Sequence, residues 1–173
     1  MKNFLVILIL FSFMLPSGAE MLTGGIKYSA EDARIELQNN KPSADFLFIA
    51  SIEDEYYDEN LSYLLKGDTK LKDRTIAKFS DGSYGVNYNN DPEHVWYYDR
   101  GGVLINAEVR TSTTPPYRTY KYDPDGTLVN MTMRVSEDET YIFNPYGQLI
   151  AHWIGEKCYD ESNNVVMTRK ILE

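Results

Sequence analysis

The sequence contains two histidines and one cysteine, the residue types that most often bind transition metals or serve as a catalytic base or nucleophile. His94 and His152 stand far apart along the chain, and neither has a cysteine or another histidine nearby at metal-ligand spacing. We therefore expect both to be ordinary residues of β-strands. We expect Cys158 to be a small buried hydrophobic residue. The alternative is a cross-link between two chains, because a single cysteine has no partner in its own chain.

The acidic turn Asp123-Pro124-Asp125-Gly126 resembles a calcium loop superficially, but calcium needs six or more oxygen ligands. Residues 127–134, which follow it, contain no Asp or Glu. No Gly-x-Ser-x-Gly, His-Glu-x-x-His or phosphate-binding glycine loop occurs either. We predict no catalytic residue, no metal, no cofactor and no enzymatic activity. The alternative is an envelope-acting enzyme inhibitor or carboxylate-dependent hydrolase, since a glycosidase needs only two carboxylates at a suitable separation.

Aromatic residues recur as three pairs whose members are separated by one residue. Because side chains alternate across a β-strand, each pair lies on one face of a sheet, and successive hairpins would align the pairs into an aromatic band. If helices cover this band, it is core, with tyrosine hydroxyls at its edge; we favour this interpretation. If it is exposed, it is a flat platform for glycan rings or another protein. The candidate binding residues of the aromatic band are Trp96, Tyr98, Tyr120, Tyr122, Tyr141 and Phe143.

Four segments align without gaps around a shared rule: aromatic, any residue, aromatic, Asp or Asn, two residues, Gly or Asn, any residue, aliphatic. The Asp or Asn is suited to open a type I turn, because its side chain accepts from backbone N–H groups two residues on. The Gly or Asn supplies a positive φ, which gives a hairpin with a bulge. The segments are 96–104, 120–128, 141–149 and a degenerate copy, 157–165, with Asn163 in place of glycine.

The unit at 120–128 resembles the tyrosine–aspartate (YD) repeat of RHS proteins, and the units at Trp96 and Tyr141 resemble weaker copies. The hairpins are also similar to MORN-type repeats. The resemblance covers about residues 94–170. In RHS proteins such repeats wind into a large β shell, and three or four copies are too few to enclose anything. The resemblance therefore implies an extracytoplasmic, repeat-like β-sheet and transfers no catalytic residue.

The elements that position these residues change type near residue 70. Upstream, Ser29-Ala30-Glu31-Asp32 has the pattern of a helix start, with a capping hydroxyl before two carboxylates. Apolar residues between 57 and 65 recur at helical spacing, whereas the run 46–52 fits a helix or a strand equally well. Downstream of about residue 71, apolar residues alternate with period two between turn signals, which indicates roughly ten strands.

These patterns predict an α+β fold, with N-terminal helices followed by an antiparallel β-meander of repeated hairpins. The boundaries are a helical segment over residues 20–70 and the hairpin sheet over 71–173, which together form a single domain. The acidic run 53–59 is interpreted as a solvated helix face, and the alternative is a docking patch for a basic partner.

The first nineteen residues have the pattern of a secretory signal peptide. Met1-Lys2-Asn3 precedes an apolar run from Phe4 to Leu15, and Ser17 and Ala19 give the small-x-small ending that predicts cleavage after Ala19. A run of twelve residues is too short to span a membrane, which needs about 20. An uncleaved anchor is the alternative. We expect a secreted or periplasmic protein that does not span the membrane after cleavage.

The mature chain of 154 residues would carry a net charge of −10, with 16 basic and 26 acidic residues. This charge argues against nucleic acid as a partner, because nucleic-acid binding needs cations that neutralise phosphates. A single cysteine excludes a disulfide framework.

Taken together, the sequence predicts an exported non-catalytic β-repeat module for protein or glycan binding. A third hypothesis is a small relic of a larger repeat protein, in which the sheet edges near Leu71 and Ile171 stay open for a partner strand. The sequence leaves the oligomeric state undecided.

Overall fold

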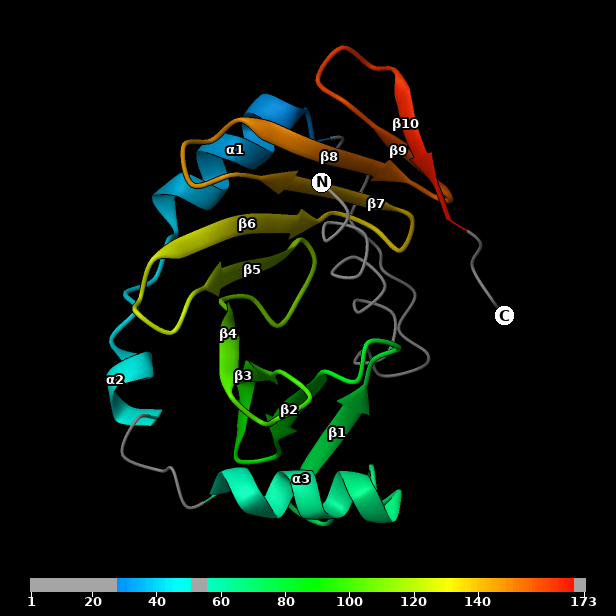
Figure 1. The fold of residues 1–173 in the computed structure, drawn as a ribbon. Coiled ribbons are helices and arrows are strands. Elements are labelled where there is room, and N and C mark those ends of the chain that lie inside the picture. Colours follow the sequence, from blue (N-terminus) through cyan, green and yellow to red (C-terminus); the bar gives the residue numbers. More distant parts are fainter. Residues whose placement is uncertain (1–27, 51–55, 170–173) are drawn as a thin grey trace.

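The computed structural model describes residues 28–50 and 56–169, which form short helices followed by one β-sheet (Figure 1). The order of helices first and strands afterwards confirms the expected α+β class. The run 46–52 is helical as far as Ala50. The predicted signal peptide lies outside the described residues. The helices are α1 (Ala30–Asn39), α2 (Phe46–Ala50) and α3 (Tyr56–Lys66).

Ten strands follow α3, and each pairs antiparallel with the next one along the chain, so the order in the sheet is the order in the sequence. Short turns suffice to join antiparallel neighbours, and the sheet is therefore a meander of consecutive hairpins. The strands are β1 (Arg74–Lys78), β2 (Tyr84–Tyr88), β3 (Asp91–Tyr98), β4 (Leu104–Arg110), β5 (Tyr117–Tyr122), β6 (Leu128–Arg134), β7 (Glu139–Phe143), β8 (Leu149–Ile154), β9 (Lys157–Tyr159) and β10 (Val165–Thr168).

One turn geometry closes the hairpins at the four places where the sequence repeats. In each of them, the backbone N–H of the Asp or Asn donates to the carbonyl four residues on, at 2.8–3.0 Å. The residue three positions after it has a φ between +62° and +85°. Such a φ favours glycine or asparagine, as the repeat rule expects. The Asp or Asn residues are Asp99, Asp123, Asn144 and Asp160, and the residues with positive φ are Gly102, Gly126, Gly147 and Asn163.

A fifth turn has the same geometry although it departs from the repeat rule. Phe79 N–H donates to the carbonyl of Ser83 at 2.9 Å, and Gly82 has a φ of +88°. The turn begins with Phe79 instead of Asp or Asn, and the Asp81 carboxylate accepts from the Ser83 N–H at 3.0 Å. Asp125 accepts from the N–H of Thr127 in the same way. A carboxylate at the third position of the turn can thus take the place of an Asp or Asn at the first position. This fifth turn therefore does not fit the repeat rule, and the sequence alignment does not include it.

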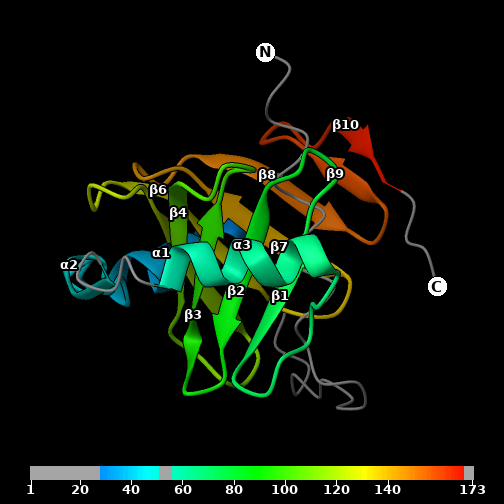
Figure 2. The ribbon, with the colours of Figure 1, turned by 60° about the horizontal axis from the view of Figure 1, so that its bottom comes forward.

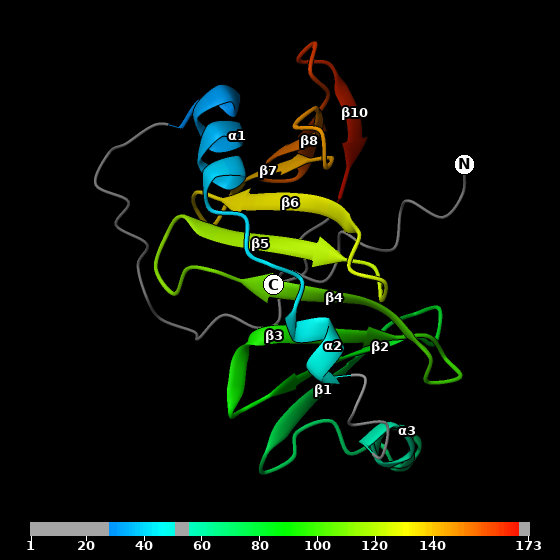
Figure 3. The same cartoon turned by 90° about the vertical axis from the view of Figure 1, so that its left-hand side faces the viewer.

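All three helices pack against one face of the sheet, which we call the helix face. Helix α1 crosses β6 and β7, α2 lies near β3, and α3 lies against β1 (Figures 2 and 3). The start of α1 is a capping box, in which Ser29 Oγ accepts from Asp32 N–H and the Asp32 carboxylate accepts from Ser29 N–H, each at 3.1 Å. The expected helix start is therefore present, and it fixes where the chain enters the helix face.

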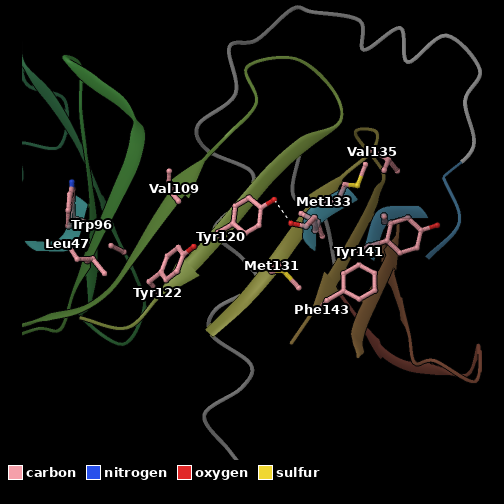
Figure 4. Close-up of a cluster of buried hydrophobic side chains, with 13 residues drawn as sticks. Leu47, Trp96, Val109, Tyr120, Tyr122, Met131, Met133, Val135, Tyr141 and Phe143 are labelled. Atoms are coloured by element: carbon pink, nitrogen blue, oxygen red, sulfur yellow. Dashed lines mark hydrogen bonds between the residues drawn. The ribbon is translucent and has the colours of Figure 1, made fainter. Parts of the chain in front are cut away.

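The main core fills the space between the sheet and the helices α1 and α2. Figure 4 shows that its side chains project from several strands and meet residues of the helical segment. Aromatic rings dominate the middle of the cluster, and two methionines fill the gaps between them, as flexible thioethers do well. The cluster consists of Ala33, Leu37, Leu47, Trp96, Ala107, Val109, Tyr120, Tyr122, Met131, Met133, Val135, Tyr141 and Phe143.

Helix α3 is attached to the sheet by a buried arginine at the start of β1. The Arg74 guanidinium donates to Asn60 Oδ1 at 2.8 Å and to the Asp73 carboxylate at 2.7 Å. It also forms a 3.3 Å salt bridge with Glu59 and lies over the ring of Tyr88, 4.9 Å from its centroid. Glu59, the last residue of the acidic run 53–59, therefore helps to attach α3 to the sheet through its salt bridge with Arg74.

Candidate functional site

The aromatic band belongs to the core on the helix face. Tyr120, Tyr122, Tyr141 and Phe143 are at most 3% exposed, Trp96 is 8% exposed, and Tyr98 is half-buried. Five of the rings, labelled in Figure 4, pack in one cluster with residues of α1 and α2. This agrees with the core interpretation, and the six rings do not form an exposed platform.

The tyrosine hydroxyls of the band are used to hold the helical segment. Tyr120 donates to the carbonyl of Leu37 and Tyr122 to the carbonyl of Pro42, each at 2.8 Å. Burial raises the pKa of both phenols to about 12. They are therefore protonated donors at neutral pH, with structural partners already in place.

Each histidine is paired with one carboxylate on the helix face. His94 Nδ1 lies 2.7 Å from the Asp91 carboxylate, and its ring packs against Phe46. His152 Nε2 lies 2.9 Å from the Glu139 carboxylate, and its ring stacks on Tyr141 with 4.1 Å between centroids. The two histidines belong to β3 and β8, and no group of three or more His, Cys, Asp or Glu side chains suited to a metal ion occurs among the described residues.

The opposite face of the sheet carries no helix in the described part of the chain, and we call it the helix-free face. A polar cluster lies on it, made by β3, β4 and β5. Glu108 and Lys121 stand directly opposite each other in the β4–β5 pair. The Tyr97 hydroxyl donates to Glu108 Oε2 at 2.9 Å, and Lys121 Nζ lies 4.9 Å from the centre of the Tyr97 ring. All three residues are buried, with Lys121 only 4% exposed.

Burial controls the ionisation of this cluster. Loss of solvation raises the pKa of Glu108, and the nearby Lys121 and the Tyr97 hydrogen bond oppose that rise. Loss of solvation also lowers the pKa of Lys121, although Glu108 and Asp123 act in the opposite direction. The pKa of Tyr97 lies well above its ordinary value for the same reason and because of the Glu108 charge. Perturbed ionisable groups of this kind gather at functional sites more often than elsewhere.

Two cations of the cluster make no hydrogen bond within the described residues. Across residues 28–50 and 56–169, the Lys121 ammonium lies over the Tyr97 ring and is attracted to the Glu108 carboxylate without a salt bridge to it. Arg110, half-buried and two residues from Glu108 on the same face, forms no hydrogen bond or salt bridge within those ranges but is attracted to the same carboxylate. The buried pair Thr119 and Thr132 lies beside them, directly opposite each other in the β5–β6 pair. The helix-free face therefore presents several donors around one carboxylate.

The cluster combines one carboxylate with several donors, and among the described residues Glu108 is the one buried carboxylate. Lys121 and Arg110 are donors, and Glu108 is an acceptor whose second oxygen is not used by Tyr97. These are the complementary groups that a polar ligand needs for recognition.

Sequence reasoning missed this cluster because its members stand on three different strands. The alternation along β4 marks Asn106, Glu108 and Arg110 only as a mixed, solvated side. The missing information is the register, which places Lys121 opposite Glu108. The signal available in the sequence is that Glu108 lies between Ala107 and Val109, and Lys121 between Tyr120 and Tyr122, all of which are core residues.

The other end of the helix-free face is apolar. Ile142, Ala151, Trp153 and Cys158 form a small buried cluster over β7, β8 and β9. Burial raises the pKa of the Cys158 thiol, whose side chain is 3% exposed. The thiol is placed as the expected small buried residue, and its burial disfavours a cross-link between two folded chains.

Comparisons with known proteins add no relative to this picture. No protein-family model matches the chain, and no curated protein and no solved structure matches it. In the part of the chain that the structure describes, no helix is sufficiently long and apolar to cross a membrane.

Proposed function

We propose that this protein is an exported, non-catalytic β-repeat module that binds a protein or glycan partner in the cell envelope or outside the cell. The signal-peptide pattern of residues 1–19 supports export. The shared turn geometry supports a repeat origin of the YD or MORN type for the hairpins. Of the two partner classes, we propose a glycan, bound at the polar cluster of the helix-free face.

The unpaired ammonium of Lys121 is the observation that carries this proposal. The Lys121 side chain is buried, but its Nζ is not a fully buried atom, so solvent or a ligand can reach the ammonium from the helix-free face. An oxygen atom of a bound ligand would replace that solvent and accept a charge-assisted hydrogen bond. Lys121 is also held in place by the Tyr97 ring and by its position between two strands, so little side-chain freedom is lost on binding.

A glycan fits the cluster because sugar hydroxyls donate and accept hydrogen bonds. Lys121 and Arg110 would donate to hydroxyl oxygens, and the free oxygen of Glu108 would accept from a hydroxyl. A protein side chain supplies fewer such groups in so small an area. The net acidity of the mature chain also opposes strongly anionic partners, which leaves neutral or weakly acidic glycans as the favoured class.

Affinity chromatography on two matrices tests the proposal. The full chain, recovered from the exported fraction of expressing cells, is passed over immobilised envelope polysaccharide and, separately, over immobilised envelope proteins. We expect retention on the polysaccharide and elution by soluble polysaccharide. Retention on the protein matrix alone would replace the glycan by a protein partner, and retention on neither matrix would contradict binding as the function.

A further inference from the structure

The two edges of the sheet are built differently. At the β1 edge, the preceding segment folds back onto the strand: Ile76 N–H donates to the Thr69 carbonyl at 2.8 Å, and Lys70 forms a β-bridge with Thr75. Helix α3 packs beside the same strand. The β1 edge is thus protected against another strand, as sheet edges in native proteins usually are.

The β10 edge has no such protection in the described residues, where β10 pairs with β9 alone. All four residues of β10 are exposed, and three of them are apolar: Val165 at 49%, Val166 at 56% and Met167 at 36%. The strand contains no charge and no proline, which are the usual means of blocking an edge. A strand that is apolar on both faces is suited to lie inside a sheet.

The backbone of β10 can accept a partner strand. Arg169 N–H points inward and donates to the Glu156 carbonyl at 2.8 Å. Because hydrogen-bonding directions alternate along an antiparallel pair, the N–H and C=O of Thr168 point outward. These groups are unused by β9 and remain available to a strand added at this edge.

The charges at the two ends of β10 identify the partner. Asp160 and Glu161 lie in the turn before the strand, whereas Arg169 follows it with its guanidinium over the Trp153 ring. An antiparallel pair of two identical β10 strands places the acidic turn of each copy near the basic end of the other. A parallel pair would place like charges together. The strand itself adds no repulsion, since it is uncharged.

We propose that β10 pairs antiparallel with β10 of a second copy of this chain, which joins the two sheets into one continuous sheet about a two-fold axis. The dimer is independent of glycan binding, because the polar cluster lies on β3, β4 and β5. With β1 protected, β10 is the one open edge among the described residues, and association ends at two copies. Pairing through a single four-residue strand makes a small interface, so the dimer is weak and dynamic.

Sedimentation velocity of the full chain over a wide concentration series tests this proposal. We expect a monomer that converts to a dimer as concentration rises, without larger species. Val166→Lys puts a charge on the open edge and is expected to raise the dissociation constant at least about tenfold. Val103→Lys is the matched control, because Val103 is 60% exposed in a turn far from β10, and it should dimerise like the unaltered chain.

Two further variants test the hydrogen bonds and the charges separately. Thr168→Pro removes an outward N–H that the monomer does not use, and it should abolish the dimer while leaving the melting temperature of the monomer near its original value. Glu161→Lys should weaken the dimer about 2–5-fold at low salt and less at high salt. A chain that stays monomeric at all concentrations, forms open-ended oligomers, or dimerises equally with Val166→Lys would overturn the proposal.

Discussion

The phenolic hydroxyl of Tyr120 on β5 donates a 2.8 Å hydrogen bond to the backbone carbonyl of Leu37 near the end of α1. Both residues are 0% exposed. A carbonyl in the last turn of a helix has no partner within the helix, so a side chain from the sheet satisfies it. The aromatic residues of the repeat therefore serve to attach the helical segment to the sheet.

Replacing Tyr120 by Phe tests this attachment. We expect the free energy of unfolding to fall by about 1–3 kcal/mol, because the variant keeps the ring and leaves the buried Leu37 carbonyl without a donor. Urea unfolding followed by circular dichroism measures the change. Tyr146→Phe is the matched control, since that ring is 85% exposed, and it should change stability by less than about 0.5 kcal/mol. Equal stability of the two variants would show that the hydroxyl does not hold α1.

The shared turn geometry predicts that substitutions at two equivalent turn positions have different effects on stability. Gly126 has a φ of +85°, and a Cβ added there would lie 3.4 Å from the Cβ of Ala44, an ordinary contact. Gly126→Ala should therefore cost about 1–2 kcal/mol through backbone strain alone. Asn163→Gly relieves a φ of +62° and should be neutral or slightly stabilising. Thermal unfolding of both variants checks this, and an unchanged Gly126→Ala protein would contradict the shared turn.

How far the sequence predicts this fold follows from the range of the interactions involved. The hairpin turns are local, because Asp99 and Gly102 lie three residues apart and carry their own conformational preferences. The sheet order then follows from short connections. The cluster around Glu108 is different, because Lys121 comes from β5, and its place opposite Glu108 depends on the β4–β5 register across the connection 111–116, which does not follow the repeated turn. No local pattern specifies such a register.

Burial of Glu108 predicts a pH dependence of stability. Because burial raises the pKa of this carboxyl in the folded protein, the folded state binds its proton more tightly than the unfolded state does. Its stabilising contribution is present at acidic pH and is lost as the pH rises from the ordinary pKa of a glutamate through the raised value. Glu108→Gln removes this titration. The free energy of unfolding of the variant, minus that of the unaltered protein, should therefore increase with pH across this window.

Denaturant unfolding at a series of pH values measures that difference. Glu161→Gln is the control, because it removes the same charge from an exposed turn. Its free energy of unfolding should differ from that of the unaltered protein by less than about 0.5 kcal/mol. A Glu108→Gln curve that is parallel to that of the unaltered protein at every pH would show that the carboxyl is not desolvated in the folded state.

Export predicts a defined N-terminus. When the full chain is expressed in a bacterium with an intact secretion pathway, the protein recovered outside the cytoplasm should begin at Glu20. Ala19→Arg removes the small residue at the cleavage position and should leave the leader attached in the membrane fraction. Intact-mass measurement distinguishes the two forms. A cytoplasmic protein that keeps Met1-Lys2-Asn3 would contradict export.

We propose that the donors of the helix-free face bind a glycan, and Lys121 gives the most direct test of this binding. The measurement is isothermal titration of the exported protein with the polysaccharide that retains it, comparing Lys121→Met with Lys78→Met, an exposed lysine on β1. Loss of one charged hydrogen bond should weaken binding by about tenfold or more in Lys121→Met. Lys78→Met should bind like the unaltered protein. Equal affinity of Lys121→Met and the unaltered protein would contradict the assignment of the site.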